Sequence, residues 1–198
     1  NIMCAHHRQH HTIRSEVQKG SIGTPRFLRA SFGIPALPKD DIRYSKALGG
    51  GALHDLGVYV IWCARFHMGE ELTLLSKNLL QGSSDVDELG SIHLVNSNGV
   101  QASLTFGFGL DYRNEYEIWG TAGSIRTTRA FSIPRDLKPP VTLRRGGTET
   151  PLDLPPDDHF SNLLGDFARR IWEHDFESAY TSVEAQAKAM RLIRQSEA

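Results

Sequence analysis

Changes in the spacing of hydrophobic and polar positions divide the chain into helical ends and a strand-rich middle. Apolar residues four apart predict a short helix over residues 9–19, and a long apolar stretch without proline predicts a second helix over residues 52–68. A glycine follows each segment, as is typical where a helix ends. Between them, residues 26–32 are a strand candidate with imperfect alternation.

Between residues 71 and 154 the chain consists of short β-rich runs separated by glycine, asparagine and serine. The dipeptide Asn98-Gly99 between two of these runs predicts a tight hairpin, because both residues tolerate a positive φ. Short turns between successive strands indicate antiparallel pairing. The predicted strands cover residues 72–80, 90–95, 100–108, 114–119, 124–128 and 141–144.

Two helices are predicted to end the chain. Apolar residues from Phe160 to Ile171 recur at helical spacing and form one stripe, and Asp158 before them is a typical N-cap. The residues Thr181 to Glu184 match a capping box, so the last helix is predicted to begin there. This order of elements predicts an α+β fold, in which helices pack on one face of a mostly antiparallel sheet.

Composition narrows the functional classes. The chain has 198 residues, a length typical of one domain, and 22 Lys plus Arg against 23 Asp plus Glu, a balance that argues against a nucleic-acid partner. Its longest run of aromatic and aliphatic side chains, residues 58–64, is too short to cross a bilayer. Because Cys4 and Cys63 form no disulfide framework, we expect a reducing, cytoplasmic setting.

The first candidate pair for chemistry is Asp55 with Tyr59, which lie four residues apart on one face of a predicted helix. A phenol can donate a proton to a carbonyl oxygen, and a neighbouring carboxylate can orient that phenol or the substrate. The same spacing also suits a buried tyrosine satisfied by a nearby acceptor, with Asp55 in an ion pair. His54, which precedes Asp55 directly, is a further candidate substrate contact.

A second candidate group follows the strand that ends near Phe108. Tyr112, Arg113 and Asn114 offer a phenol, a cation and an amide at the edge of the predicted sheet. Such side chains can hold a polar ligand, and they are equally common in ordinary turns.

The run Gly49-Gly50-Gly51 directly precedes a predicted helix, as a phosphate-binding loop does. His54 stands where the dinucleotide fingerprint needs its last glycine, and no strand leads into the run. The alternative is that residues without Cβ let the helix begin close to another backbone or to a ligand.

Histidines gather near the start of the chain. His6 with His10, and His7 with His11, have the spacing of metal ligands on one helical face. A zinc protease requires a glutamate between its two histidines, and none is present here. A charged residue, Arg8, lies within the cluster. We therefore expect histidines that line the surface or a cleft, and no metal.

These motifs together resemble a known family. Residues 47–59, ALGGGALHDLGVY, resemble the helix signature of the Gfo/Idh/MocA oxidoreductases, and residues 119–125, WGTAGSI, are similar to its late hairpin. The opening residues and the helix around Asp166 are similar to the family as well. Tyr59 and residues 112–117 resemble most the glucose–fructose oxidoreductase and nucleotide-sugar 3-ketoreductase branch.

The resemblance implies that residues 1–198 form a glyceraldehyde-3-phosphate-dehydrogenase-like C-terminal domain for substrate binding and oligomerisation. It implies a longer parent enzyme with a preceding dinucleotide-binding domain, NAD or NADP as cofactor, and a sugar or nucleotide-sugar substrate. No cofactor is expected on these residues alone, which would then be inactive in isolation. Tyr59 would protonate the ketone oxygen, Asp55 would contact the sugar, and the sheet face would pack on a second copy. The alternative is a non-catalytic binding or assembly module derived from that family.

Overall fold

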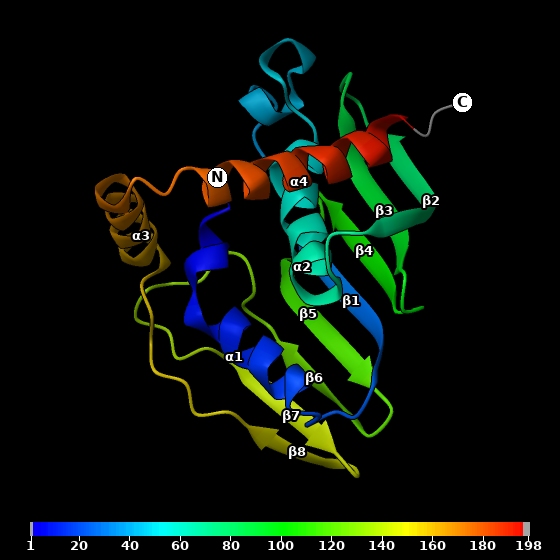
Figure 1. Cartoon of the computed structure of the whole chain (residues 1–198). Coiled ribbons are helices and arrows are strands. Elements are labelled where there is room, and N and C mark those ends of the chain that lie inside the picture. The colour runs from blue at the N-terminus through cyan, green and yellow to red at the C-terminus, as the bar shows by residue number, and fades with distance from the viewer. Residues whose placement is uncertain (1, 196–198) are drawn as a thin grey trace.

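In the computed structural model, which describes residues 2–195, eight strands form one sheet in the order β2-β3-β4-β1-β5-β6-β7-β8 (Figure 1). The helices α1 (Arg8–Gln18), α2 (Val58–Met68) and α4 (Glu177–Gln195) lie over the same face, whereas α3 (His159–Glu173) stands beside the sheet. This arrangement confirms the predicted α+β fold. The strands are β1 (Pro25–Gly33), β2 (Leu72–Gln81), β3 (Asp87–Asn96), β4 (Gln101–Gly107), β5 (Arg113–Gly120), β6 (Gly123–Thr127), β7 (Val141–Arg145) and β8 (Thr148–Pro151).

The predicted antiparallel pairing holds for every neighbouring pair of strands but one. β1 inserts between β4 and β5, running parallel to β4 and antiparallel to β5. Along β1, Leu28, Ala30 and Phe32 are buried beneath the helices, and the intervening side chains face away from them. The edge strand β8 was not predicted from the sequence, because all four of its residues are exposed and leave no alternation of apolar and polar positions.

The turn between β3 and β4 differs in detail from the predicted one. Only Gly99 has a positive φ, +75°, and Asn98 does not. Asn96 holds the turn, since its Oδ1 accepts the backbone N–H groups of Asn98 at 3.1 Å and of Val100 at 2.9 Å. The tight hairpin is therefore present, but a side-chain acceptor stabilises it in place of a second left-handed residue.

The central helix α2 is a core helix. Its buried residues run without a break from Val60 to Arg65, and the elements packed around it include β1, β4 and α4. The wider segment Lys46–Met68 is apolar enough by composition to cross a membrane, but 56% of its most apolar window is buried inside the fold. A core helix accounts for that hydropathy.

The helix α4 begins earlier than predicted. It starts at Glu177, so the expected capping box lies inside the helix, where the Thr181 hydroxyl donates to the Glu177 carbonyl at 3.0 Å. Gln186 ties α4 to α2, because its amide donates to the Val58 carbonyl at 3.0 Å and accepts from the buried Arg65 at 2.6 Å. The capping-box prediction is wrong because a serine or threonine also satisfies itself within a helix.

The helix α3 begins as predicted, with Asp158 Oδ1 accepting the N–H groups of Phe160 and Ser161 at 3.0 and 3.2 Å. The predicted apolar stripe exists, but only Leu163 in it is half-buried, and its other side chains are exposed rather than directed to the core. α3 packs instead on the short helix η1 (Met3–His6) at the start of the chain.

Candidate active site

A cavity of about 420 Å³ opens where the start of α2 meets β1 and the segment after β6. The loop helix η2 (Ile42–Tyr44) and the first turn of α3 complete its wall. Its apolar lining comes from Met3, Phe32, Ile34, Leu56, Phe131, Ile133, Pro134 and Phe160, and its polar side chains are Arg43, Asp55, Tyr59, Ser132 and His159. The two halves of the first candidate pair therefore face one cavity.

Tyr59 is held by aromatic packing. Its ring meets Phe32 edge-on at 5.6 Å between centroids and lies 6.1 Å from Phe131. Its hydroxyl makes no hydrogen bond to any residue within 2–195, so it is free to meet a ligand in the cavity. Burial raises the pKa of Tyr59 above its ordinary value, and the nearby Cys4 and Asp55 raise it further. The phenol is therefore protonated near neutral pH and can donate.

Asp55 is held by an ion pair. Arg43 Nε lies 3.0 Å from Asp55 Oδ2, and the same guanidinium contacts Asp41 Oδ2 at 3.0 Å. Asp41 also accepts the Arg43 backbone N–H at 2.9 Å, which anchors η2. Sequence reasoning missed Arg43, since it lies in a loop with no fixed spacing to Asp55. The one hint in the sequence was that Asp55 is the sole acidic residue within 52–69, which suggests a cationic partner from another segment.

The helix that carries the pair begins with a π turn, η4 (Leu53–Gly57), so the prediction of one α-helix over 52–68 is only partly correct. The Val58 N–H donates to the Leu53 carbonyl, five residues back, and widens the turn. Gly57 lies against Phe106, whose ring a Cβ at this position would approach to 3.1 Å. Such widened turns are frequent at functional sites.

The glycine run before η4 is no phosphate cradle. Asp87 Oδ2 accepts the Leu53 N–H at 2.6 Å, so a protein carboxylate already occupies the start of the helix. Gly51 has φ +116°, and a Cβ there would lie 2.5 Å from Asp87 Oδ1. A Cβ on Gly50 would lie 2.3 Å from the Arg43 carbonyl oxygen. The glycines therefore permit close backbone approach, which was the alternative interpretation.

His54 does not line the cavity with Asp55 and Tyr59. Its Nδ1 lies 3.2 Å from the Gly49 carbonyl and 3.3 Å from Arg194 Nη2. The role of His54 as a substrate contact stays a prediction.

The structure brings only part of the second candidate group together, since Asn114 Nδ2 donates to Tyr112 Oη at 3.0 Å. Asn114 is buried, and its Oδ1 accepts the backbone N–H groups of Ala130 at 3.0 Å and Phe131 at 2.6 Å. Asn114 thus positions a segment that lines the cavity. Tyr112 is exposed beneath Arg129, and Arg113 lies over the sheet face that the helices leave open. Neither lines the cavity of Tyr59, and their contact with substrate stays a prediction.

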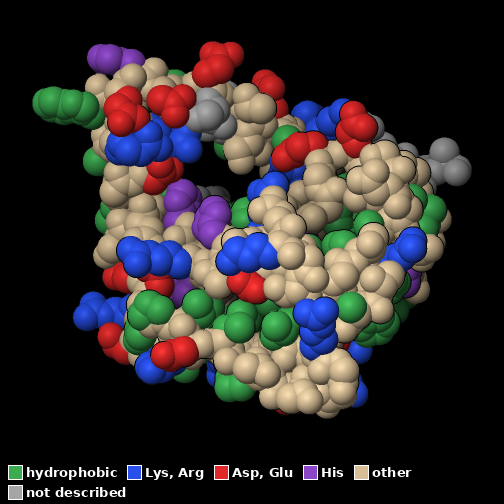
Figure 2. Space-filling view, turned by 60° about the horizontal axis from the view of Figure 1, so that its bottom comes forward, with side chains coloured by type: hydrophobic (Ala, Val, Ile, Leu, Met, Phe, Trp, Pro, Cys, Tyr) green, Lys and Arg blue, Asp and Glu red, His purple; other side chains and the backbone are tan. Residues whose placement is uncertain are grey.

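The histidines near the start of the chain are mostly structural. His10 is fully buried, with Nδ1 3.0 Å from Tyr116 Oη and Nε2 2.9 Å from the Ala130 carbonyl. His7 Nδ1 accepts the Gln9 N–H at 3.2 Å. No group of three His, Cys, Asp or Glu within the described residues is placed to hold a metal. Figure 2 shows histidine side chains gathered between α3 and α1.

His159 is a cavity residue that sequence reasoning missed. It is the first residue of α3, is 4% exposed, and lines the same cavity as Tyr59. Burial lowers its pKa, so its imidazole is neutral near pH 7. His159 and Tyr59 are far apart in sequence and share a cavity only through tertiary packing, which leaves no signal in local spacing.

Residues 10–126 match the model of a protein family described as the GFO/IDH/MocA C-terminal domain. A curated relative from Streptomyces antibioticus, a dTDP-3,4-didehydro-2,6-dideoxy-alpha-D-glucose 3-reductase, is 39% identical over 87% of this chain and 53% of its own length. A protein of the same name from Actinomadura kijaniata is 36% identical over 98% of this chain and 59% of its own length. The chain thus spans a little more than half the length of these relatives.

Among solved structures, the chain is similar to KijD10, a 3-ketoreductase from Actinomadura kijaniata in complex with NADP and TDP-benzene. The TM-score is 0.90 at 34% identity, over 97% of this chain and 59% of that chain. The match therefore extends over nearly every element described above, α3 and α4 included.

Proposed function

The chain belongs to the GFO/IDH/MocA family, and from this premise we propose that it is the substrate-binding, catalytic C-terminal part of a longer reductase. The substrate class is a nucleotide-linked sugar that carries a ketone, and the cofactor of the parent protein is NADP. The names of the curated relatives and the ligands in the KijD10 structure support both choices.

The observation that carries the proposal is the unpaired hydroxyl of Tyr59 on the wall of a cavity with apolar sides. In the direction of reduction, Tyr59 Oη donates its proton to the ketone oxygen and later regains one from solvent. Asp55, held by Arg43, accepts a hydrogen bond from a neighbouring sugar hydroxyl and so orients the ring. The apolar walls exclude water from the reacting carbon.

The residues of this chain suit the reacting end of a cofactor better than its phosphates. Within residues 2–195 the glycine run before a helix is filled by Asp87, whereas the cavity at Tyr59 is open to a ligand. A reduced nicotinamide, when bound, supplies the hydride to the carbonyl carbon. We propose that a domain preceding these residues holds the dinucleotide, and that the 198-residue chain alone is inactive.

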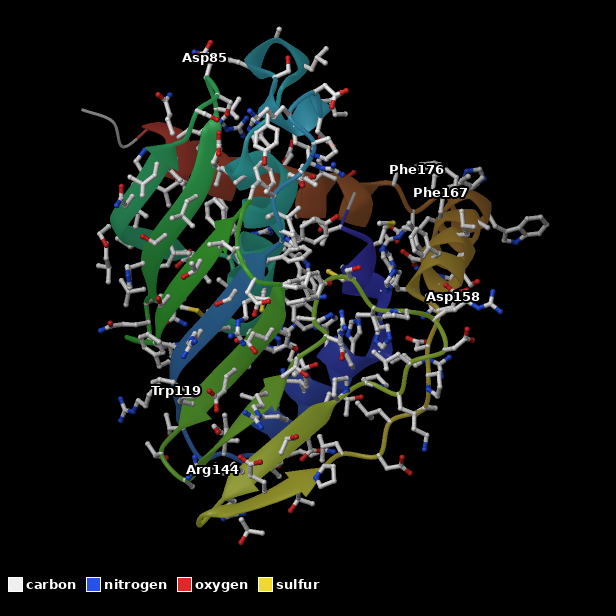
Figure 3. The ribbon with its side chains drawn as sticks, turned by 180° about the vertical axis from the view of Figure 1, so that it is seen from behind. Asp85, Trp119, Arg144, Asp158, Phe167 and Phe176 are labelled. Carbon is white, nitrogen blue, oxygen red and sulfur yellow. The ribbon has the colours of Figure 1, made fainter. Side chains whose placement is uncertain are left out.

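We also propose that the uncovered sheet face joins a second copy in a homo-oligomer. Figure 3 looks onto that face, where Trp119 and Arg144 are labelled. Trp119 is 41% exposed and its ring stacks on Phe27 at 5.1 Å, which offers an apolar centre among charged side chains. The two free, buried cysteines, Cys4 and Cys63, suit the reducing, cytoplasmic setting that we propose.

The experiment is the substitution Tyr59→Phe in the longer protein that contains these residues. We expect kcat for ketone reduction to fall about 10²–10⁴-fold, with NADP affinity unchanged, since only the proton donor is removed. Tyr112→Phe tests the second group separately, and a raised KM at unchanged kcat would support its contact with substrate. Unchanged turnover of Tyr59→Phe would contradict the role of Tyr59 as proton donor, whereas a longer protein that reduces no ketone would favour the non-catalytic assembly module.

A further inference from the structure

His159 lines the cavity of Tyr59 with hydrogen-bonding capacity that the described residues leave unused. It is the first residue of α3, directly after the N-cap Asp158 that Figure 3 labels, and it is only 4% exposed. Its Nδ1 is buried and has no hydrogen-bond partner within residues 2–195. Nε2 is not enclosed in this way and is the nitrogen that a ligand in the cavity can reach. A buried imidazole with an unpaired nitrogen is uncommon in a folded protein and needs a reason.

His7, whose ring centroid lies 6.0 Å from that of His159, is unpaired in the complementary way. His7 is fully buried, and its Nδ1 accepts the backbone N–H of Gln9 at 3.2 Å. Because a backbone N–H only donates, the single proton of a neutral imidazole in this position lies on Nε2. That Nε2 is buried and has no acceptor in the part of the chain that the structure describes. A donor on His7 and an acceptor on His159 therefore lie in neighbouring rings.

Both imidazoles are neutral near pH 7. Burial lowers the pKa of His7 and of His159, and it outweighs the opposing effect of the nearby carboxylates of Asp157 and Asp158. A neutral histidine has one donor and one acceptor, and the partner of one nitrogen decides which nitrogen holds the proton. A hydrogen bond from His7 Nε2–H to His159 Nδ1 thus leaves His159 with its proton on Nε2, the nitrogen open to the cavity.

Other buried histidines do not combine these features. His10 is fully buried, and both of its nitrogens have partners, Tyr116 Oη at 3.0 Å and the Ala130 carbonyl at 2.9 Å. His67 has a buried, unpaired Nε2, but it does not line the cavity of Tyr59. Among the described histidines, His159 is thus the one placed to use its free capacity on a ligand in that cavity.

The part of a ligand that reaches Tyr59 is also the part that reaches His159, because one cavity of about 420 Å³ serves both. The cationic side chain in the lining, Arg43, is paired with Asp55 at 3.0 Å. Within residues 2–195 the lining therefore offers no unpaired arginine or lysine to a diphosphate. A neutral N–H donor suits an oxygen of an uncharged sugar instead.

We propose that His159 donates a hydrogen bond from Nε2–H to an oxygen of the sugar, and that His7 is the positioning residue that holds this tautomer. The inference rests on the proposed function. The sugar then meets donors at Tyr59 and His159 and an acceptor at Asp55. Contacts from two segments far apart in the chain define the orientation of a ring better than contacts from one helix turn. His159 therefore helps to decide which carbon of the sugar faces Tyr59.

The test compares two ligands of the longer protein with NADP bound. TDP-glucose carries sugar oxygens, and TDP-benzene has the same nucleoside diphosphate without them. By binding calorimetry, His159→Phe should raise the Kd of TDP-glucose about 3–10-fold, the effect of one neutral hydrogen bond, and leave that of TDP-benzene unchanged. His159→Gln, whose amide N–H can take the place of Nε2–H, should recover most of the affinity. The control His67→Phe removes an imidazole outside the cavity and should change neither Kd.

The role of His7 is tested by NMR of the imidazole nitrogens in the 198-residue chain, which distinguishes the two tautomers. We expect His159 to hold its proton on Nε2. His7→Asn keeps an acceptor for the Gln9 N–H, since asparagine is a good N-cap, but removes the donor to His159. His159 should then also populate the Nδ1–H tautomer. In the longer protein, the same variant should raise the Kd of TDP-glucose about 2–3-fold and leave that of TDP-benzene unchanged.

Equal weakening of both ligands by His159→Phe would overturn the sugar contact, because it would indicate the shared nucleoside diphosphate or a general change of the cavity. Unchanged affinity for TDP-glucose, or an unmodified chain with the His159 proton on Nδ1, would overturn it as well. A longer protein that binds neither ligand would contradict the proposed substrate class, and the sugar contact with it. Turnover of Tyr59→Phe concerns the proton donor alone, so the proposed function and the role of His159 can fail separately.

Discussion

The helices α2 and α3 differ in where their apolar side chains lie: those of α2 are buried, and most of those of α3 are exposed. α2 has no distinct apolar face and is buried over six consecutive residues, from Val60 to Arg65. α3 has a clear stripe, yet the stripe faces outward and its polar side packs on η1. The difference teaches that helical periodicity predicts a stripe reliably, but the presence of a covering element decides whether that stripe is core or interface.

The largest expected loss of unfolding free energy comes from truncating a buried side chain of α2, and the same truncation on α3 should cost far less. Ile61→Ala in α2 removes a fully buried side chain and should cost about 2–5 kcal/mol of unfolding free energy. Ile171→Ala in α3 removes a side chain that is 47% exposed and should change it by less than about 0.5 kcal/mol. Urea unfolding of the 198-residue chain measures both. Similar losses in the two variants would mean that α3 is packed in solution.

The histidines packed around α2 should make the fold sensitive to acid. Burial lowers the pKa of His67 to about 3 and that of His10 well below its ordinary value. Both therefore bind a proton more readily when unfolded, so stability is complete above about pH 6.5 and declines as the pH falls below it. Each contributes about 1.4 kcal/mol per pH unit in that window.

Urea unfolding at pH 7.5, 6 and 5 gives this slope, and His67→Phe should reduce it by one histidine's share. A slope that His67→Phe leaves unchanged would exclude His67 from the buried set. The variant's own stability at pH 7.5 is the reference, so a general loss of packing does not imitate the result.

A side chain at the glycine run before α2 should destabilise the fold. Gly51→Ala, before α2, forces φ +116° on a residue with a Cβ and places that Cβ against Asp87. We expect a loss of about 1–3 kcal/mol. Thermal and urea unfolding should agree on it. A neutral result would mean that Asp87 and the glycine run move apart at little cost.

The smallest expected effect is a gain in unfolding free energy rather than a loss. Gly165 lies inside α3, and no neighbouring atom lies within 4 Å of the position that a Cβ would take, so Gly165→Ala should meet no steric conflict. Alanine favours the helix over glycine by about 0.5–1 kcal/mol, and stability should rise by up to that amount. Calorimetry of the 198-residue chain tests this, and a decrease would show that Gly165 touches a neighbour.

The candidate site was predictable where its residues share one helix. Asp55 and Tyr59 have a fixed spacing, and both line one cavity although a π turn lies between them. Arg43 and His159 come from a loop and a distant helix, so no spacing relates them to Tyr59. Asn114 was predicted as a ligand contact, and that contact stays a prediction. In the structure its amide oxygen accepts the backbone N–H of Phe131, a use that no local spacing indicated.

Local chemistry in the sequence determined the α+β order of elements, most strand positions, the N-cap at Asp158 and the pairing of Asp55 with Tyr59. These features depend on residues close in sequence, whose spacing is set by backbone geometry. Tertiary structure alone decided the parallel insertion of β1 beside β4 and the outward direction of the apolar side chains on α3. Both depend on which distant surfaces bury each other, and no local pattern encodes that choice.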